Sequence, residues 1–159
     1  MFLLLIYVSI SRIVYQDWAA RRYIYCGPVI QNLLNEVFFQ DRDDDAIRCR
    51  DFYEPFPKLA LALIMTAIDC AIDEWHTGKR GRITFSETAY RPVYKTYLED
   101  LNRFELEGLQ HNILGKLQAR MYRDGLEHAG VQYQPVTSVS MSKEVLANGV
   151  AELVVEFNN

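Results

Sequence analysis

The sequence predicts an all-α protein, a single-domain bundle of four to six helices joined by irregular, aromatic-rich connections. Apolar residues recur every three or four positions in several segments, which is the spacing of one helical face. Glycine or proline separates these segments and marks where each helix stops. The chain has 159 residues, half of them hydrophobic, which is enough for one domain with a buried core.

Composition restricts the class of partner and compartment. The net charge of −4 creates no overall field that would attract nucleic acid or an anionic membrane. The three cysteines, Cys26, Cys49 and Cys70, are odd in number and lack metal-ligand or redox spacing. A reducing compartment, the cytoplasm or the nucleus, is therefore expected.

Residues 1–22 form an apolar N-terminal segment that we separate from the helical domain at residues 23–159. The run MFLLLIYVSI lacks a preceding basic region and is shorter than the roughly 20 residues of a membrane-spanning helix. We interpret it as a packed helix or strand, or as a segment foreign to the domain. The alternative, that residues 2–10 are a signal or anchor, would make the protein secreted or membrane-associated.

The first expected helix opens at Pro28, because proline is favoured at the first helical position. The acidic run at residues 41–45 ends this helix. Residues 46–57 contain Pro55 and Pro57 and are expected to be an extended aromatic connection. The apolar stripe of the helix comprises Val29, Ile30, Leu33, Leu34, Val37 and Phe38.

The second expected helix covers residues 58–75. Its first half is apolar nearly all round, which is typical of a central buried helix. Leu61 and Leu63 are therefore both placed in the core. Gly78 is expected to follow the helix as a left-handed cap.

The third expected helix begins near Arg91 or kinks at Pro92, because proline disrupts a helix interior. Before it, Thr84 and Glu87 have the spacing of a capping box. The stripe of this helix comprises Tyr90, Tyr94, Tyr97, Leu101 and Phe104.

Two further helices complete the expected bundle. The fourth covers residues 106–124, with Gly125 as its cap and with Ile113, Leu114, Leu117 and Met121 facing inward. Residues 131–139 are expected to be irregular. Ser142 caps the last helix, although residues 150–157 also suit a strand. The stripe of the last helix comprises Leu146, Val150, Leu153, Val154 and Phe157.

Three segments together resemble a helical domain of unknown function that is abundant in mushroom-forming fungi. They are PVIQNLLNEVFF, FPKLALALIMTAIDCAIDEWHTGKRGRITFSETAYRPVYKTYLEDL and HNILGKLQARMYRDGLEHAG, which cover roughly residues 26–130. The resemblance implies a predominantly helical fold and brings no assigned catalytic or binding residues. It also implies a basic or mixed segment in place of residues 41–45, and no proline at Pro92.

The acidic run has the first ligand positions of a calcium-binding EF-hand loop, at Asp41, Asp43 and Asp45. That loop needs glycine at its sixth position and a bidentate glutamate at its twelfth. Ala46 and Phe52 occupy these positions, so the run is interpreted as a solvated loop.

One polar face of the second helix carries Asp69, Asp73 and His76. Two carboxylates and an imidazole at this spacing can hold a divalent cation or act as acid and base, with His111 or His128 completing the set. The common interpretation is a solvated or structural face. No metal and no cofactor is therefore assigned, and the cluster defines an alternative in which the protein is an enzyme of unknown reaction.

A possible binding surface follows the second helix and comprises Trp75, His76, Lys79, Arg80 and Arg82. Its three basic residues can contact phosphate, which defines a further alternative, a weak nucleic-acid-binding module. The glycine spacing of a phosphate-binding loop is missing. Pairing with Asp73, Glu74 or the acidic run is the other interpretation.

No catalytic signature is present, and no catalytic residue is assigned. The sequence has no Gly-x-Ser-x-Gly elbow, and Cys70 lies in an apolar helix where a thiol behaves as a small hydrophobe. The leading prediction is a non-catalytic protein-interaction or self-association module, because so many apolar and aromatic residues can leave a patch exposed. Its expected partner is a protein or a second copy. Nucleic acid is not expected, and neither is a membrane unless residues 2–10 are a signal or anchor.

Overall fold

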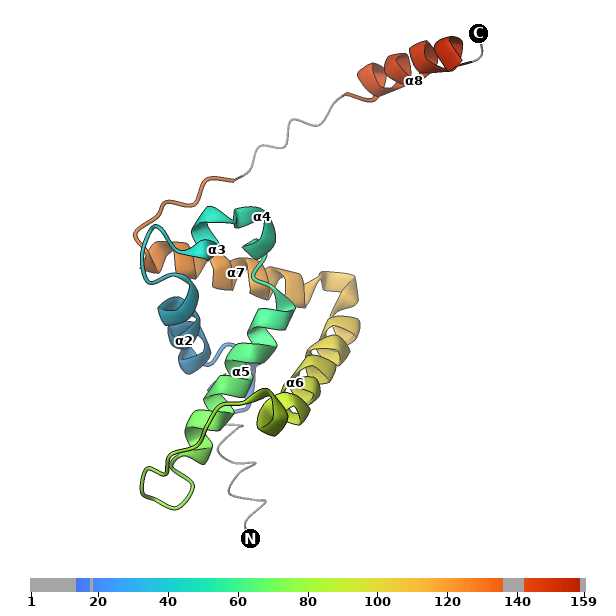
Figure 1. Ribbon diagram of the computed structural model, residues 1–159. Coiled ribbons are helices and arrows are strands. Elements are labelled where there is room, and N and C mark those ends of the chain that lie inside the picture. The colour runs from blue at the N-terminus through green and yellow to red at the C-terminus, as the bar shows by residue number, and fades with distance from the viewer. Residues whose placement is uncertain (1–13, 18, 136–141, 158–159) are drawn as a thin grey trace.

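The structure is a computed structural model that describes residues 14–17, 19–135 and 142–157. The described residues are predominantly helical, as predicted, with one small two-stranded sheet. They form seven α-helices rather than the expected four to six, because two helices consist of a single turn. Four longer helices form the body, and a fifth stands apart from it (Figure 1).

Two short strands precede the helices. β1 (Tyr15–Asp17) pairs antiparallel with β2 (Arg22–Ile24), and the Asp17 carboxylate accepts a hydrogen bond from the Ala20 amide at 3.1 Å. Three-residue strands are too short to produce an alternating pattern, so the sequence did not predict them. Residues 1–13 of the expected N-terminal segment lie outside the described residues.

α2 (Pro28–Phe38) has Pro28 in its first turn, as predicted. Ile30 and Leu34 are buried against the core, whereas Val29 and Val37 of the predicted stripe are exposed. After the helix, the Phe39 ring packs edge-on against Tyr122, with 5.5 Å between ring centroids.

The prediction of an extended connection at residues 46–57 was wrong for its first half. α3 (Asp45–Arg48) and α4 (Arg50–Tyr53) each form one helical turn there. In the loop before the first turn, the Asp44 carboxylate accepts the amides of Gln40 and Asp41 at 2.5 and 3.1 Å. The Asp44 side chain thus shapes the loop that precedes the helix, because a short aspartate side chain can accept hydrogen bonds from nearby backbone amides.

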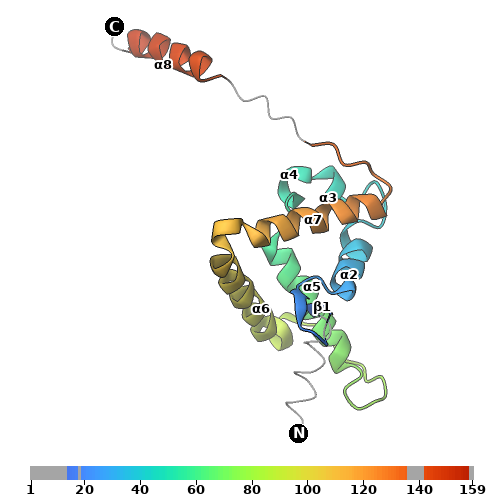
Figure 2. The same ribbon diagram turned by 180° about the vertical axis from the view of Figure 1, so that it is seen from behind.

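α5 (Lys58–Asp73) and α6 (Glu87–Glu107) lie side by side, with α2 against the other flank of α5 and α7 across the back (Figures 1 and 2). α5 ends before the expected residue 75, and Gly78 has the predicted left-handed backbone, with φ of 78°, in the turn that follows. Leu61 is buried as predicted. The placement of Leu63 in the core was wrong, because its side chain is 46% exposed on the opposite face.

The start of α6 also differs from the prediction. Ser86, rather than Thr84, caps the helix, and its hydroxyl accepts the Ala89 amide at 3.4 Å. Pro92 lies inside the helix. The cost of the missing amide is offset by packing on either side of it, since Tyr90 and Tyr97 are both buried.

α7 (Ile113–His128) follows the 3-10 turn η1 (Leu109–His111) and crosses the other helices (Figure 2). Leu114, Leu117 and Met121 are buried as predicted, whereas Ile113 is exposed. Gly125 was expected to cap the helix but lies inside it. The Phe39 ring fills the space that a side chain at this position would need, so close packing rather than a helix end accounts for the glycine.

α8 (Lys143–Phe157) begins with the predicted cap, since the Ser142 hydroxyl accepts the Val145 amide at 3.3 Å. The segment at residues 150–157 is helical and not a strand. Residues 131–135 are irregular as predicted, while residues 136–139 and the side chain of Leu153 lie outside the described part. None of the described helices has both the length and the apolar character needed to cross a bilayer.

Candidate functional site

The largest of the hollows that we describe is an apolar groove of about 850 Å³ between α5 and α6. We refer to it as the α5–α6 groove. One wall belongs to the exposed face of α5, and the other belongs to α6 and the residues just before it. Its apolar lining includes Leu59, Leu63, Phe85, Tyr90, Tyr94 and Leu98.

The groove exists because α5 is apolar on more sides than its neighbours cover. Leu61, Met65 and Ile68 belong to the buried core cluster. Leu59 and Leu63, one helical turn apart on another face, are 59% and 46% exposed. A face of this kind on a soluble protein commonly marks a contact surface.

The α6 wall repeats the same spacing. Tyr94 and Leu98 are one turn apart and half-buried, and Phe85 covers the end of the wall by packing against Tyr90, with 5.5 Å between ring centroids. Arg91 and Lys95 lie on the exposed side of the same turns. Arg91 pairs with Glu87, which leaves the rim with an excess of basic charge.

Two hydrogen bonds between α5 and α6 hold these walls together. The Tyr90 hydroxyl donates to the Asp73 carboxylate at 2.9 Å, and the Tyr97 hydroxyl donates to the Asp69 carboxylate at 2.8 Å. Burial raises the pKa of both tyrosines, and the hydrogen bonds with the aspartates raise it further. The phenols therefore stay protonated and keep donating at physiological pH.

These bonds account for the two carboxylates of the predicted metal or acid–base cluster. Asp69 and Asp73 face tyrosines of α6, and His76 lies in the exposed turn beyond the helix end. Across residues 14–17, 19–135 and 142–157, no group of three or more histidine, cysteine, aspartate or glutamate side chains is arranged to hold a metal ion. The hydrogen bonds from Tyr90 and Tyr97 give the two aspartates a structural role in the α5–α6 contact.

The predicted binding surface after the second helix forms an exposed loop at the end of α5 (Figure 1). Trp75, His76, Lys79, Arg80 and Arg82 are all exposed, and none of them lines the groove. Arg80 donates to the Glu74 carboxylate at 2.9 Å, which is one of the pairings expected for the basic residues.

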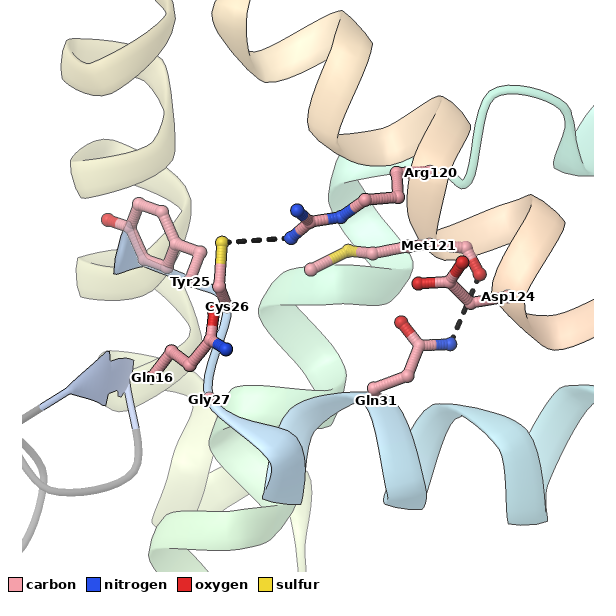
Figure 3. A pocket seen from close by; sticks show the side chains of 8 residues that line it. All are labelled: Gln16, Tyr25, Cys26, Gly27, Gln31, Arg120, Met121 and Asp124. Carbon is pink, nitrogen blue, oxygen red and sulfur yellow. Dashed lines mark hydrogen bonds between the residues drawn. The ribbon is translucent and has the colours of Figure 1, made fainter. Parts of the chain in front are cut away.

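A second hollow, of about 250 Å³, is polar and lies between the start of α2 and α7 (Figure 3). The Arg120 guanidinium donates to the Cys26 sulfur at 3.0 Å, and the Gln31 amide donates to the Met121 carbonyl at 3.1 Å. Asp124 and Gln16 complete the opening. These bonds tie α2 and the residue before it to α7.

Tyr25 also lines this polar hollow. Burial raises the pKa of Tyr25 to about 12, with a smaller contribution from Asp100. The ring packs edge-on against Phe104 with 5.2 Å between centroids. A phenol that stays neutral and packs against the core is suited to a structural role here.

Sequence reasoning missed both hollows. The groove residues Leu59, Leu63 and Phe85 were overlooked because a helix that is apolar all round was assigned to the core as a whole. A finer signal was available, since Leu59 and Leu63 lie on a different face from Leu61 and Met65. The polar hollow joins residues 94 positions apart, Cys26 and Arg120, for which the local pattern holds no signal.

Comparison with protein families now identifies the chain. Residues 7–104 match the model of a domain of unknown function, DUF6532. The chain belongs to this family. No curated protein and no solved structure matches it.

The extent of the DUF6532 match can be compared with the site. It begins upstream of residue 26, where the resemblance was expected to begin, and it ends within α6. Both walls of the α5–α6 groove therefore lie within the DUF6532 domain. The polar hollow takes only its α2 side from that domain, because Arg120, Met121 and Asp124 lie beyond the match.

Proposed function

We propose that this DUF6532 protein is a non-catalytic interaction module that accepts an apolar helix of a protein partner in the α5–α6 groove. The observation that carries the proposal is the exposed leucine pair of α5, Leu59 and Leu63, facing a second apolar wall on α6. Two apolar walls side by side suit the mode in which an amphipathic helix binds through residues three or four positions apart.

The energetics favour a partner of this kind. Fully burying an exposed leucine side chain contributes about 1.5–3 kcal/mol. Leu59 and Leu63 are 59% and 46% exposed, so covering them together with the ring of Phe85 contributes a part of that free energy at each position. The rim adds selectivity rather than affinity, because Arg91 and Lys95 are exposed to solvent. A helix with acidic flanks is the preferred class of partner.

A reducing compartment is part of the same proposal. Cys26, Cys49 and Cys70 are free thiols, which supports the cytoplasm or the nucleus as the site of the interaction.

The test is a selection of helical peptides from a displayed library against the full chain. We expect the selected peptides to be amphipathic and acidic at their flanks. Leu63→Asp should weaken their binding by roughly thirtyfold or more, because it places a charge at the centre of the contact. Binding is measured by fluorescence anisotropy with each labelled peptide.

Phe52→Asp is the matched control. Phe52 is 79% exposed on α4, and it does not line the groove, so this variant should bind the peptides as the wild type does. A selection that yields no binder, or binders that tolerate Leu63→Asp but not Phe52→Asp, would contradict the groove as the interaction site. Circular dichroism of each variant establishes that it is folded.

A further inference from the structure

We infer that the occupant of the α5–α6 groove is α8 of a second copy of the chain, so that two copies exchange their last helices. This inference rests on the proposed function and names its partner. It requires an apolar stripe on α8 that matches the groove, compatible charge, and a geometry in which the contact forms twice.

α8 presents the required stripe. Leu146, Val150 and Phe157 lie on one helical face, and their side chains are 53%, 61% and 80% exposed. A helix with such a face is stable in water only when another surface covers it, because isolated helices of this length are marginal. The covering surface must be apolar and elongated.

The groove has a matching length. Along α6 its wall extends from Glu87 to Leu98, and along α8 the stripe extends from Leu146 to Phe157. Both intervals contain the same number of residues and correspond to about 17 Å at the rise of an α-helix. The stripe can therefore contact the α6 wall over its full length while Leu59 and Leu63 close the other side.

The charges of the two surfaces are complementary. α8 carries Glu144 and Glu152 against a single lysine, Lys143, among its described side chains. The groove rim carries Arg91 and Lys95 against Glu87. Opposite net charges favour the encounter of α8 with this rim over other faces.

The arrangement of the chain favours a second copy over the same copy. α8 lies beyond α7 and away from the body in both views, whereas the groove is formed by α5 and α6 (Figures 1 and 2). A two-fold exchange repeats the contact, so it buries twice the area of one helix in one groove. Stable interfaces bury about 1,200–2,000 Å², which a repeated contact approaches more readily than a single one.

The experiment is sedimentation velocity of the full chain at low micromolar concentration. The wild type should be a dimer. Leu146→Asp on α8 and Leu63→Asp in the groove should each raise the dissociation constant of the dimer by roughly thirtyfold or more. Phe52→Asp should remain dimeric. Leu63 and Leu146 are both partly exposed, so neither substitution is expected to unfold the body, which circular dichroism checks.

Mixing the two defective variants provides a sharper result. A chain with Leu63→Asp retains an intact α8, and a chain with Leu146→Asp retains an intact groove. Only a pair made of one chain of each variant therefore has an intact contact between α8 and the groove. The mixture should contain this heterodimer, whereas each variant alone should be largely monomeric. Differently labelled chains detect it by fluorescence resonance energy transfer.

Other outcomes would overturn the inference in distinguishable ways. A dimer that is lost with Leu63→Asp but kept with Leu146→Asp would reject α8 as the occupant and keep the groove as an interaction site. A monomer at every concentration would reject the second copy. If Leu146→Asp then increased the binding of an apolar dye to that monomer, α8 of the same chain would be the occupant. A dimer that tolerates both substitutions would reject the inference and the groove together.

Discussion

α7 and α8 have nearly the same length and similar apolar stripes, yet their environments differ. In α7, Leu114 is 1% exposed, and α2 and α6 cover the stripe. In α8, the corresponding face is exposed, and the helix stands apart from the body (Figure 1). A stripe in a sequence thus specifies that a face requires cover, but it does not specify whether that cover belongs to the same molecule.

The largest expected difference between the two helices is in their leucines. Leu114→Ala should lower the free energy of unfolding by about 2–5 kcal/mol, because it leaves a cavity under α7. Leu146→Ala should change it by less than about 0.5 kcal/mol in a single copy, since that side chain is exposed. Urea unfolding followed by tryptophan fluorescence at high dilution measures both, and equal losses would mean that α8 packs on its own body.

The next largest effect comes from replacing a glycine in each of the two helices, which should lower stability in α7 and raise it in α8. A side chain at Gly125 would meet the Phe39 ring at 2.6 Å, whereas at Gly149 it would meet nothing within 4 Å. Gly125→Ala should therefore destabilise the body by about 1–3 kcal/mol, despite a better helix propensity. Gly149→Ala should instead stabilise α8 by about 0.5–1 kcal/mol, which far-UV circular dichroism detects as increased helicity. A stabilising Gly125→Ala would show that Phe39 does not pack there.

The smallest expected effect is a change of stability with pH. We expect it from a residue of the body, Asp69, and not from a residue of α8. Burial raises the pKa of Asp69, and this outweighs the hydrogen bond from Tyr97, which lowers it. The folded state then binds this proton more tightly than the unfolded state. The stability that Asp69 contributes is complete below its unfolded pKa and is lost as the pH rises through the folded value.

The wild type should accordingly lose stability relative to Asp69→Asn as the pH rises through that interval. Urea unfolding of both proteins over an acidic pH series tests this. Glu144→Gln on α8 is the control, and its unfolding should follow the wild type throughout because the side chain is exposed. A difference that grows in the other direction would mean that the Tyr97 bond dominates.

The helical character of the chain could be predicted because it depends on local periodicity. The stripe of Tyr90, Tyr97 and Leu101 is buried as expected, even though Pro92 obscured the start of its helix. The cap was misplaced because Thr84 and Ser86 are both good caps, and the packing of Phe85 on Tyr90 favours the second.

The candidate site could not be predicted to the same extent. Leu61 and Leu63 are identical residues two positions apart, and only the placement of α2 and α6 makes one of them core and the other surface. The acidic and basic residues that attracted attention in the sequence, such as Asp73 and Arg80, form pairs with near neighbours in the fold. Polar residues were conspicuous in the sequence, whereas the exposed apolar face was not.

The two tyrosine–aspartate bonds have a mechanical consequence for the groove. Tyr90 and Tyr97 reach Asp73 and Asp69 in opposite chain directions, so the pair fixes the register of the two antiparallel helices at two points. Sliding one helix along the other by a single turn would break both bonds together and leave two carboxylates half-buried without donors. The two bonds therefore keep α5 and α6 from sliding past each other, so the fold itself sets the register of the two groove walls.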